Sequence, residues 1–287
     1  MNIDPNVITL IVHADDFGID KETNLGIQYG FNNGILTSTS IMATGEAFDH
    51  AIQIARTTPK LDIGIHLTLT ETKPLLPTEQ VNSLISRSGD FHIHINRFLL
   101  QYMTGKINLI EVNNELEQQI KKVLKENISI THIDGHQHIH VLPKIWSITT
   151  ALAKKYNIPY IRIPNEKIKF ADGQKITGVS RMLQLLILRA FCKRCKTNEF
   201  NKDISFFGFL SGGKLNSYSF NYLLNNMPKE TVNELMCHPG FNSKHYSYWR
   251  YNKEVELNTL CDDKTKNKIQ QNKTQLISYR DLIKIRY

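Results

Sequence analysis

The chain has 287 residues, enough for one sizeable hydrophobic core, and α/β barrels of this length often form a single domain. A hydrophobic fraction of 41% and an aromatic fraction of 9% exclude a disordered or fibrous protein. The formal net charge of +8 fits surplus lysines on a solvated surface. No nucleic-acid-binding motif accompanies this charge, so we expect no nucleic-acid partner.

Short apolar runs alternate with helical patterns along the chain. Strands are expected at 7–14, 35–42, 61–69, 128–134, 159–163 and 232–237, with a further short strand inside 273–283. Helices are expected at 24–33, 48–57, 111–126 and 143–156, and at the end of 273–283. The polar residues 15–18 are expected to form a loop after the first strand.

This alternation favours an α/β architecture with a parallel sheet. Polar side chains follow at least four of the strands, and in a (β/α) barrel such strand ends meet at one face. An open doubly wound sheet more often carries a Gly-rich phosphate loop after its first strand, and A-D-D-F-G at 14–18 is not one. We predict a single-domain barrel over 1–287, with its active site at the carboxyl ends of the strands.

Residues 165–215 depart from the regular alternation. They are rich in lysine and arginine and contain an apolar stretch at 182–191. We interpret this stretch as a helix packed on the core with a solvated basic end. The alternative is a lid or a membrane-surface helix that recruits an amphiphilic glycan, which would give the protein peripheral membrane contact.

The cysteines and the N-terminus bear on the compartment. Cys192, Cys195, Cys237 and Cys261 are too scattered for a disulfide framework, and the lone C-x-x-C lacks a second pair. They predict free thiols in a reducing compartment. No basic segment precedes the first apolar run, and no run reaches membrane-spanning length. We therefore expect a cytoplasmic protein without a signal peptide or a transmembrane segment.

Two adjacent carboxylates, Asp15 and Asp16, follow the apolar first strand. Both cannot be buried there without a positive partner, because isolated buried charge is very costly, and a divalent cation is a suitable partner. One carboxylate would bind the metal while the other faces the metal-bound water. Taken alone, however, an Asp-Asp pair is more typical of an exposed turn.

The strongest chemical signal is H-I-D-G-H-Q-H-I-H at 132–140, with four histidines in nine residues. Imidazole is a common ligand of transition metals, and Asp134 would fix the tautomer of such a ligand. His66 lies on the opposite face of its strand from the alternating apolar residues, where a lone histidine is more often a core residue. His238 is held at a strand end by Pro239, although packing against the last helix fits it equally well.

One or two carboxylates with two histidines would form a three-ligand metal site with open positions, which is typical of catalysis. Such a metal polarises a carbonyl and activates water, and a carboxylate takes the proton. A remote histidine can donate a proton to the leaving amine, and an ordinary pKa near 6.5 would allow His238 to do so. This chemistry is the hydrolysis of an amide.

Eight motifs in this order and spacing are similar to those of a known family. The chain resembles the YdjC-like carbohydrate deacetylases, which include chitooligosaccharide deacetylases and hopanoid-biosynthesis-associated members. The matching segments run through almost the whole chain: H-A-D-D-F-G (13–18), N-G-I-L-T-S-T-S-I-M (33–42), G-I-H-L-T-L-T (64–70), T-H-I-D-G-H-Q-H-I-H-V-L-P (131–143), I-R-I-P (161–164), E-L-M-C-H-P-G (234–240), K-E-V-E-L-N-T-L (253–260) and I-S-Y-R-D-L (277–282).

The resemblance implies a distorted (β/α) barrel and one divalent metal ion held by Asp16, His66 and His136. Asp15 would then be the general base and His238 the general acid. Mg²⁺ is the ion that the resemblance suggests, whereas two histidines and one carboxylate suit Zn²⁺. The match is least regular at 165–215, where we expect substrate choice to be set.

The resemblance also implies supporting residues. Arg162 stands where the family carries an arginine, and would orient Asp15 or contact the substrate. Asp134 and His138 are the other candidates for contact with the substrate or with the ligands. His13 stands where the family frequently carries an asparagine, a change that alters the surroundings of the ligands and leaves the ligands in place.

The leading hypothesis is a metal-dependent N-deacetylase whose substrate is an N-acetylated sugar or glycolipid. The sugar remains open between a chitooligosaccharide, a lipid-linked glucosamine and an antibiotic intermediate. A catalytically silent sugar- or metal-binding protein is the alternative, but it would lack the base or the acid, and Asp15 and His238 are both present. A metal-dependent phosphoesterase would need further carboxylates that bridge two metals.

Overall fold

The structure is a computed structural model that describes residues 4, 6–167, 179–195, 200, 204–242 and 251–286, so parts of the segment 165–215 lie outside the described residues. The strands are β1 (Thr9–Phe17), β2 (Ser38–Ile41), β3 (Asp62–Leu67), β4 (His132–Gly135), β5 (Tyr160–Ile161), β6 (Ile204–Phe207), β7 (Val232–Cys237) and β8 (Gln275–Leu276). The helices are α1 (Lys21–Asn33), α2 (Phe48–Thr57), α3 (Ile95–Met103), α4 (Leu109–Lys125), α5 (Pro143–Lys155), α6 (Val179–Cys192), α7 (Ser217–Asn226), α8 (Lys253–Cys261), α9 (Asp263–Gln271) and α10 (Tyr279–Arg286), with short 3₁₀ helices η1 (Thr78–Gln80) and η2 (His136–Val141).

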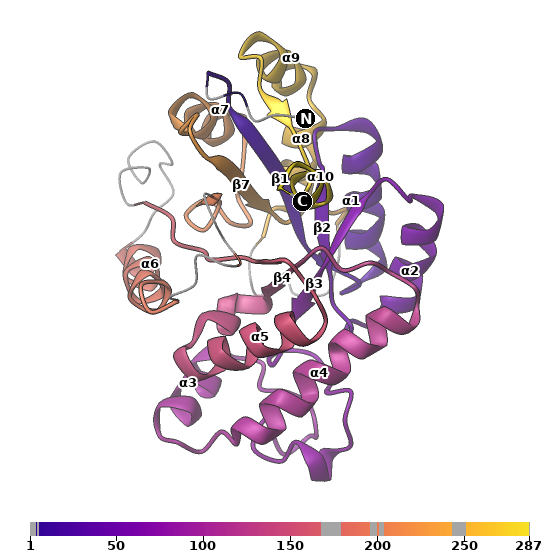
Figure 1. The fold of residues 1–287 in the computed structure, drawn as a ribbon, viewed down its shortest axis with the longest axis vertical. Coiled ribbons are helices and arrows are strands. Elements are labelled where there is room, and N and C mark those ends of the chain that lie inside the picture. Colours follow the sequence, from indigo (N-terminus) through magenta and orange to yellow (C-terminus); the bar gives the residue numbers. More distant parts are fainter. Residues whose placement is uncertain are drawn as a thin grey trace.

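The strands form one parallel sheet in the order β5-β4-β3-β2-β1-β7-β6, and β8 pairs with the start of β1. The sheet curls into a half-barrel surrounded by helices (Figure 1). The predicted distorted (β/α) barrel is thereby confirmed. In a parallel sheet of this kind the carboxyl ends of all strands lie at one edge, which is where a site can be assembled from distant parts of the chain.

Strand β1 lies at the centre of the sheet, between β2 and β7. Every residue of β1 is buried, because helices cover both faces of the sheet there, and this explains its nearly continuous apolar run. The strand is longer than expected: it continues to Phe17, so the prediction of a loop at 15–18 is wrong. A register shift between Ala14 and Phe17 and a positive φ of 67° at Asp16 mark a bulge in which pairing with β2 is interrupted and then resumes.

Several elements are absent from the sequence-based prediction: β6, α3, α7, α8 and α9. Helix α9 reads D-K-T-K-N-K-I-Q-Q and buries only Thr265 and Ile269, so it has almost no apolar periodicity to detect. Helix α7 begins at a capping box made by Asn216 and Ser219, a signal that is available in the sequence. The expected helix at 48–57 and strand at 232–237 agree with α2 and β7 to the residue.

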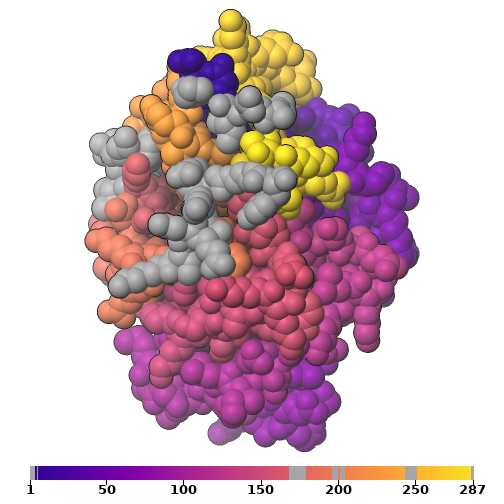
Figure 2. All heavy atoms as spheres, viewed as in Figure 1, coloured from indigo at the N-terminus to yellow at the C-terminus, as the bar shows by residue number. Residues whose placement is uncertain are grey.

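The apolar stretch at 182–191 lies in α6, and only one face of this helix packs on the core. Leu185, Leu188 and Cys192 are buried, whereas Leu183 and Leu186 are exposed. The interpretation as a core-packed helix is therefore right for half of its surface. Figure 2 shows α6 at the surface of the molecule, near the region of α3. Among the described residues, no helix combines the length and apolar composition needed to cross a membrane.

One close contact fixes the loop that follows β7. Gly26 of α1 lies against Gly240, two residues after His238, and a Cβ at Gly26 would overlap the Cα of Gly240 and lie 2.9 Å from its N and C atoms. The contact is formed by backbone atoms, and backbone cannot move aside as a flexible side chain can. The absence of a side chain at Gly26 therefore determines where the His238 loop sits.

We predict that Gly26→Ala destabilises the protein by about 1–3 kcal/mol, because overpacking displaces backbone. Gly30→Ala in the same helix is the matched control: its Cβ would meet Leu257 Cδ1 at an ordinary 3.4 Å. This control is expected to be neutral or to stabilise the helix by up to about 1 kcal/mol. Urea unfolding of both variants measures the difference, and equal stabilities would contradict the contact.

Candidate functional site

One cavity opens at the carboxyl ends of β1, β3, β4 and β7. Six of the eight predicted site residues line it: Asp15, Asp16, His66, His136, His138 and His238. The other two, Asp134 and Arg162, are buried behind them. The structure therefore brings together residues that are more than 200 positions apart in the sequence.

Asp16, His66 and His136 form one of the three groups of candidate metal ligands found among the described residues. Oδ1 of Asp16 lies 3.3 Å from Nε2 of His66 and 3.0 Å from Nδ1 of His136. The candidate ligand atoms of the three residues all lie within 4.8 Å of one another, and all three side chains are buried. Two imidazole nitrogens and one carboxylate oxygen at this separation fit the donor set of a divalent transition metal and leave positions open for water and substrate.

The far nitrogen of each imidazole is held by another carboxylate. Nδ1 of His66 lies 2.8 Å from Oδ1 of Asp134, and Nε2 of His136 lies 3.0 Å from Oε2 of Glu71. Metal-binding histidines are commonly oriented in this way, because the carboxylate fixes the tautomer and leaves the other nitrogen free to bind. The donor set and its supports thus fit a divalent cation.

The same carboxylates set the electrostatics of the site. Burial lowers the pKa of both imidazoles, but the carboxylates outweigh it: they raise the pKa of His66 to about 9, with Asp134 the main contributor, and that of His136 to about 10, with Glu71 the main contributor. Burial would raise the pKa of Asp16, yet its contacts with His136 and His66 hold it well below its usual range. The site is thus negative enough to attract either protons or a cation.

Glu71 is absent from the residues predicted above. It directly follows the motif at 64–70 that carries His66, four residues after the end of β3, and its backbone has a positive φ of 71°. Gln137, also at positive φ, donates its side-chain amide to Oε1 of Glu71. A non-glycine residue in the left-handed region is uncommon and often marks a functional site, but no sequence signal reveals the backbone angle.

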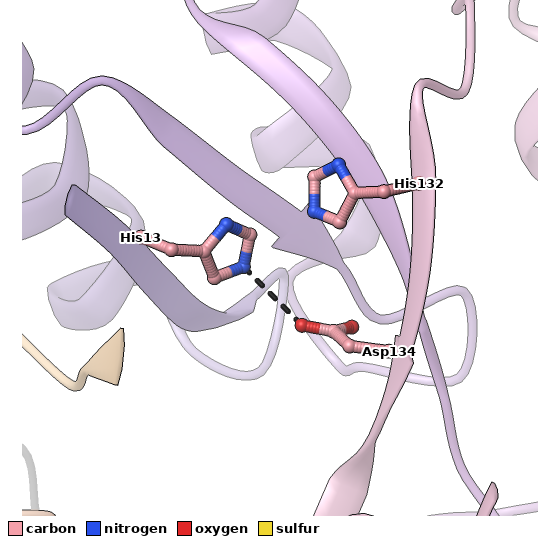
Figure 3. A group of neighbouring side chains, drawn as sticks. All are labelled: His13, His132 and Asp134. Carbon is pink, nitrogen blue, oxygen red and sulfur yellow. Dashed lines mark ion pairs between the residues drawn. The ribbon is translucent and has the colours of Figure 1, made fainter. Parts of the chain in front are cut away.

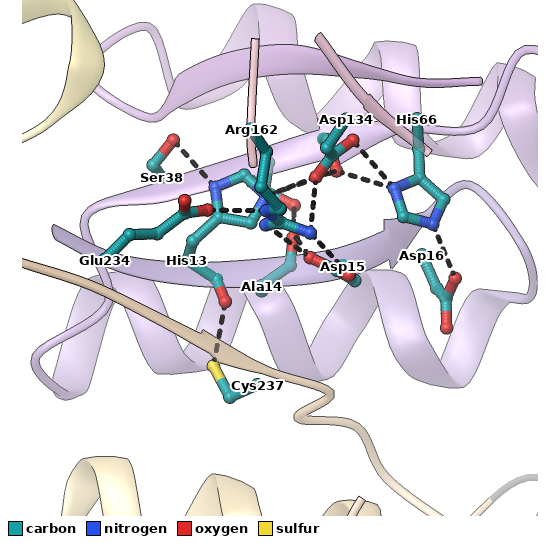
Figure 4. A network of polar contacts seen from close by, with 12 residues as sticks. His13, Ala14, Asp15, Asp16, Ser38, His66, Asp134, Arg162, Glu234 and Cys237 are labelled. Atoms are coloured by element: carbon teal, nitrogen blue, oxygen red, sulfur yellow. Dashed lines mark hydrogen bonds and ion pairs between the residues drawn. The ribbon is translucent and has the colours of Figure 1, made fainter. Parts of the chain in front are cut away.

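Arg162 connects Asp15 of the first strand to two further buried carboxylates, Asp134 and Glu234 (Figure 4). Its guanidinium binds both oxygens of Asp15, at 2.8 and 2.9 Å, and also reaches Asp134 at 2.9 Å and Glu234 at 2.7 Å. Asp15 therefore points to Arg162 while its neighbour Asp16 points to the imidazoles. The bulge in β1 produces this divergence of adjacent side chains.

His238 faces Asp15 from the end of β7. Its Nε2 lies 4.0 Å from Oδ2 of Asp15, and its ring packs on Tyr251. Burial lowers the pKa of His238 to about 4, so the ring is neutral at pH 7, which corrects the ordinary value used in the sequence analysis. Glu256, also absent from the predicted set, accepts the backbone N–H of His238, and burial raises the pKa of its carboxyl group to about 7.

A second histidine group lies deeper in the half-barrel (Figure 3). His13, His132 and Asp134 also place candidate ligand atoms within 4.8 Å of one another. The oxygen of Asp134 that faces His13 at 3.2 Å already accepts Ser40 at 2.8 Å and the guanidinium of Arg162 at 2.9 Å. A cation there would sit beside a buried positive charge. We interpret this group as a core network that fixes Asp134.

His138 lines the cavity but belongs to none of the candidate ligand groups found among the described residues. Its ring lies next to Phe206 and Phe209, and burial lowers its pKa well below the usual value. His138 therefore adds a neutral ring to the cavity wall beside two aromatic rings.

The fold and the site together define a class: a curled α/β half-barrel with an Asp-His-His group and a separate Asp-Arg pair at the carboxyl ends of its strands. The family model described as YdjC-like protein matches residues 9–271, and the chain belongs to this family.

Curated relatives cover almost all of the chain. A carbohydrate deacetylase of Clostridium beijerinckii is 32% identical over 281 residues, which are 95% of this chain and 99% of that protein. A chitooligosaccharide deacetylase of Escherichia fergusonii is 31% identical over 279 residues, with 95% and 98% covered. A crystal structure from Enterococcus faecalis, provisionally described as a cellobiose-phosphate cleavage protein, aligns with a TM-score of 0.78 at 28% identity over 96% of this chain and 99% of that chain.

We predict that Glu71→Gln weakens the binding of Zn²⁺ or Mg²⁺ by about 10- to 100-fold, because the amide no longer fixes the far nitrogen of His136 as a carboxylate does. Isothermal titration calorimetry at one pH measures the affinity. The control is Glu126→Gln, which removes only a surface ion pair with Arg56. An unchanged affinity in Glu71→Gln would show that Glu71 does not support a ligand.

Proposed function

We propose that the protein is a metal-dependent hydrolase that removes the N-acetyl group from an amino sugar, free or part of a glycolipid. The observation that carries the proposal is the convergence of Asp16, His66 and His136 with Asp15 and His238 in one cavity. The names of the curated relatives, carbohydrate and chitooligosaccharide deacetylase, support the same reaction class.

Asp16, His66 and His136 would hold the ion, with Zn²⁺ favoured by the two imidazole nitrogens and Mg²⁺ by the family resemblance. When bound, such an ion polarises the acetyl carbonyl and lowers the pKa of a neighbouring water. Asp15 is the group placed to accept the proton of that water. Arg162 binds both oxygens of Asp15 and so fixes the direction of the carboxylate, while each oxygen retains a second lone pair for the proton.

The leaving amine must be protonated, because an amide anion is far too basic to depart. His238, which directly follows β7, is the proposed donor, and its Nε2 lies 4.0 Å from Oδ2 of Asp15. Its ring is neutral in the free protein, but negative charge that develops on the substrate during attack favours its protonation. Glu256, with a pKa of about 7, lies 4.0 Å from Nδ1 of His238 and can exchange a proton with the ring.

The alternative, a catalytically silent sugar- or metal-binding protein, is less well supported. Such a protein would not need a base and an acid in one cavity, and both Asp15 and His238 line it. A phosphoesterase with two bridged metals is disfavoured because Arg162 already neutralises the carboxylates next to the candidate ligands.

The direct test is release of free amine from a panel of N-acetylated sugars, glycosides and oligosaccharides, with and without chelator. We expect turnover that a chelator abolishes and that added Zn²⁺ or Mg²⁺ restores. His136→Ala should lose both metal and activity while the fold survives, since barrel stability resides in the core layers. A His136→Ala protein with full metal content and full activity would refute the ligand assignment.

The roles of Asp15 and His238 separate on two substrates, the acetamide and an activated ester of the same sugar. Asp15→Asn should slow both by about two to four orders of magnitude, because both need an activated water. His238→Ala should slow the acetamide far more than the ester, since an activated alcohol departs without a proton. Steady-state rates measure this contrast. Equal damage to amide and ester by His238→Ala would mean that His238 positions the substrate and donates no proton.

A further inference from the structure

The cavity continues beyond the ligands into an arm with an apolar wall. The wall is formed by Leu99 of α3, by Leu142 just before α5, and by Ile187, Leu188 and Phe191 of α6. These residues come from three separate elements and face one space, so the wall is a built feature of the fold. We call this space the apolar arm. Figure 1 shows α6 and α3 on the same side of the molecule.

The wall offers few hydrogen-bond partners. The polar side chains on it from α3 and α6 are Asn96, Gln184 and Arg181. Arg181 already donates from Nε and Nη2 to the carbonyl oxygen of Phe209, at 2.9 and 2.6 Å, and its guanidinium stacks on the Phe209 ring at 4.2 Å. A further sugar unit carries several hydroxyl groups, and hydroxyls left unpaired in a buried site weaken binding. The arm is thus poorly suited to a second sugar.

We propose that the apolar arm binds an uncharged apolar aglycone, an alkyl chain or an aromatic group, attached to the amino sugar whose acetyl group lies at the ligand site. This inference rests on the proposed function, from which it takes the deacetylation reaction, and it adds the class of substrate. Ile187 supports this placement, because it lines the cavity and is also 48% exposed, so it stands at the mouth where a chain would enter. Burial of each additional methylene on such a wall strengthens binding by about fourfold.

The test compares methyl and hexyl β-glycosides of N-acetylglucosamine, at concentrations below micelle formation. We expect kcat/KM for the hexyl glycoside to exceed that for the methyl glycoside by about tenfold or more, mainly through KM, because the added methylenes bind equally in ground and transition states. Chitotriose, which presents sugar units to the arm, is expected to be a poorer substrate than the hexyl glycoside.

Two adjacent residues of α6 give a matched pair of variants. Ile187→Asn places an amide on the arm and should reduce the hexyl-to-methyl ratio towards one. Leu186→Asn is the control: Leu186 is similarly exposed, at 46%, but it does not line the cavity, so the ratio should stay high. An equal fall of the hexyl-to-methyl ratio in both variants would mean that the substitutions act on the helix as a whole, and it would overturn the proposal.

The outcomes also separate this inference from the proposed function. Equal kcat/KM for both glycosides, or a clear preference for chitotriose, overturns the arm and leaves deacetylation intact. If neither glycoside releases amine, the proposed function fails. Calorimetric titration of the two glycosides into the protein then tests, independently of catalysis, whether the arm binds an apolar aglycone. Binding of the hexyl glycoside about tenfold tighter than the methyl glycoside, lost in Ile187→Asn, would support the arm, and equal affinities would overturn it.

Discussion

The site depends on one buried cation, the guanidinium of Arg162, and its contacts with three carboxylates. Burial would lower the pKa of Arg162, but Asp134, Asp15 and Glu234 raise it well above its usual range, so the group stays charged. This charge offsets part of the cost of burying each carboxylate in the core. Through Asp15 the guanidinium fixes the proposed base, and through Asp134 it fixes His66. Arg162, which directly follows β5, therefore supports both the proposed base and one proposed metal ligand.

The alternation of strands and helices was sufficient to predict the half-barrel, because each strand carries enough apolar residues to stand out between the helical patterns. The dense histidine motif likewise marks the end of β4. Glu71 and Glu256 could not be found in this way, since each reaches the site from outside the strands, and their positions depend on loop angles and helix placement. The pKa of His238 depends on burial, which residue spacing does not reveal.

Helix α6 links the irregular part of the chain to the site. Its buried face packs on the core through Leu185 and Leu188, while Ile187 and Phe191 line the cavity beside α3. A single helix can serve both purposes because residues three and four apart share a face. The proposed ligands and base lie at or directly after strand ends, whereas the apolar arm is lined mainly by helices outside the sheet. Under this proposal, variation in the arm would change the substrate without altering the proposed metal ligands.

The central claim is that Asp16, His66 and His136 are the metal ligands. Crystals soaked in Zn²⁺ and measured at the zinc absorption edge test it most directly. The account predicts one strong anomalous peak among Oδ1 of Asp16, Nε2 of His66 and Nδ1 of His136. A strong peak between His13, His132 and Asp134, with none at the first position, would contradict it.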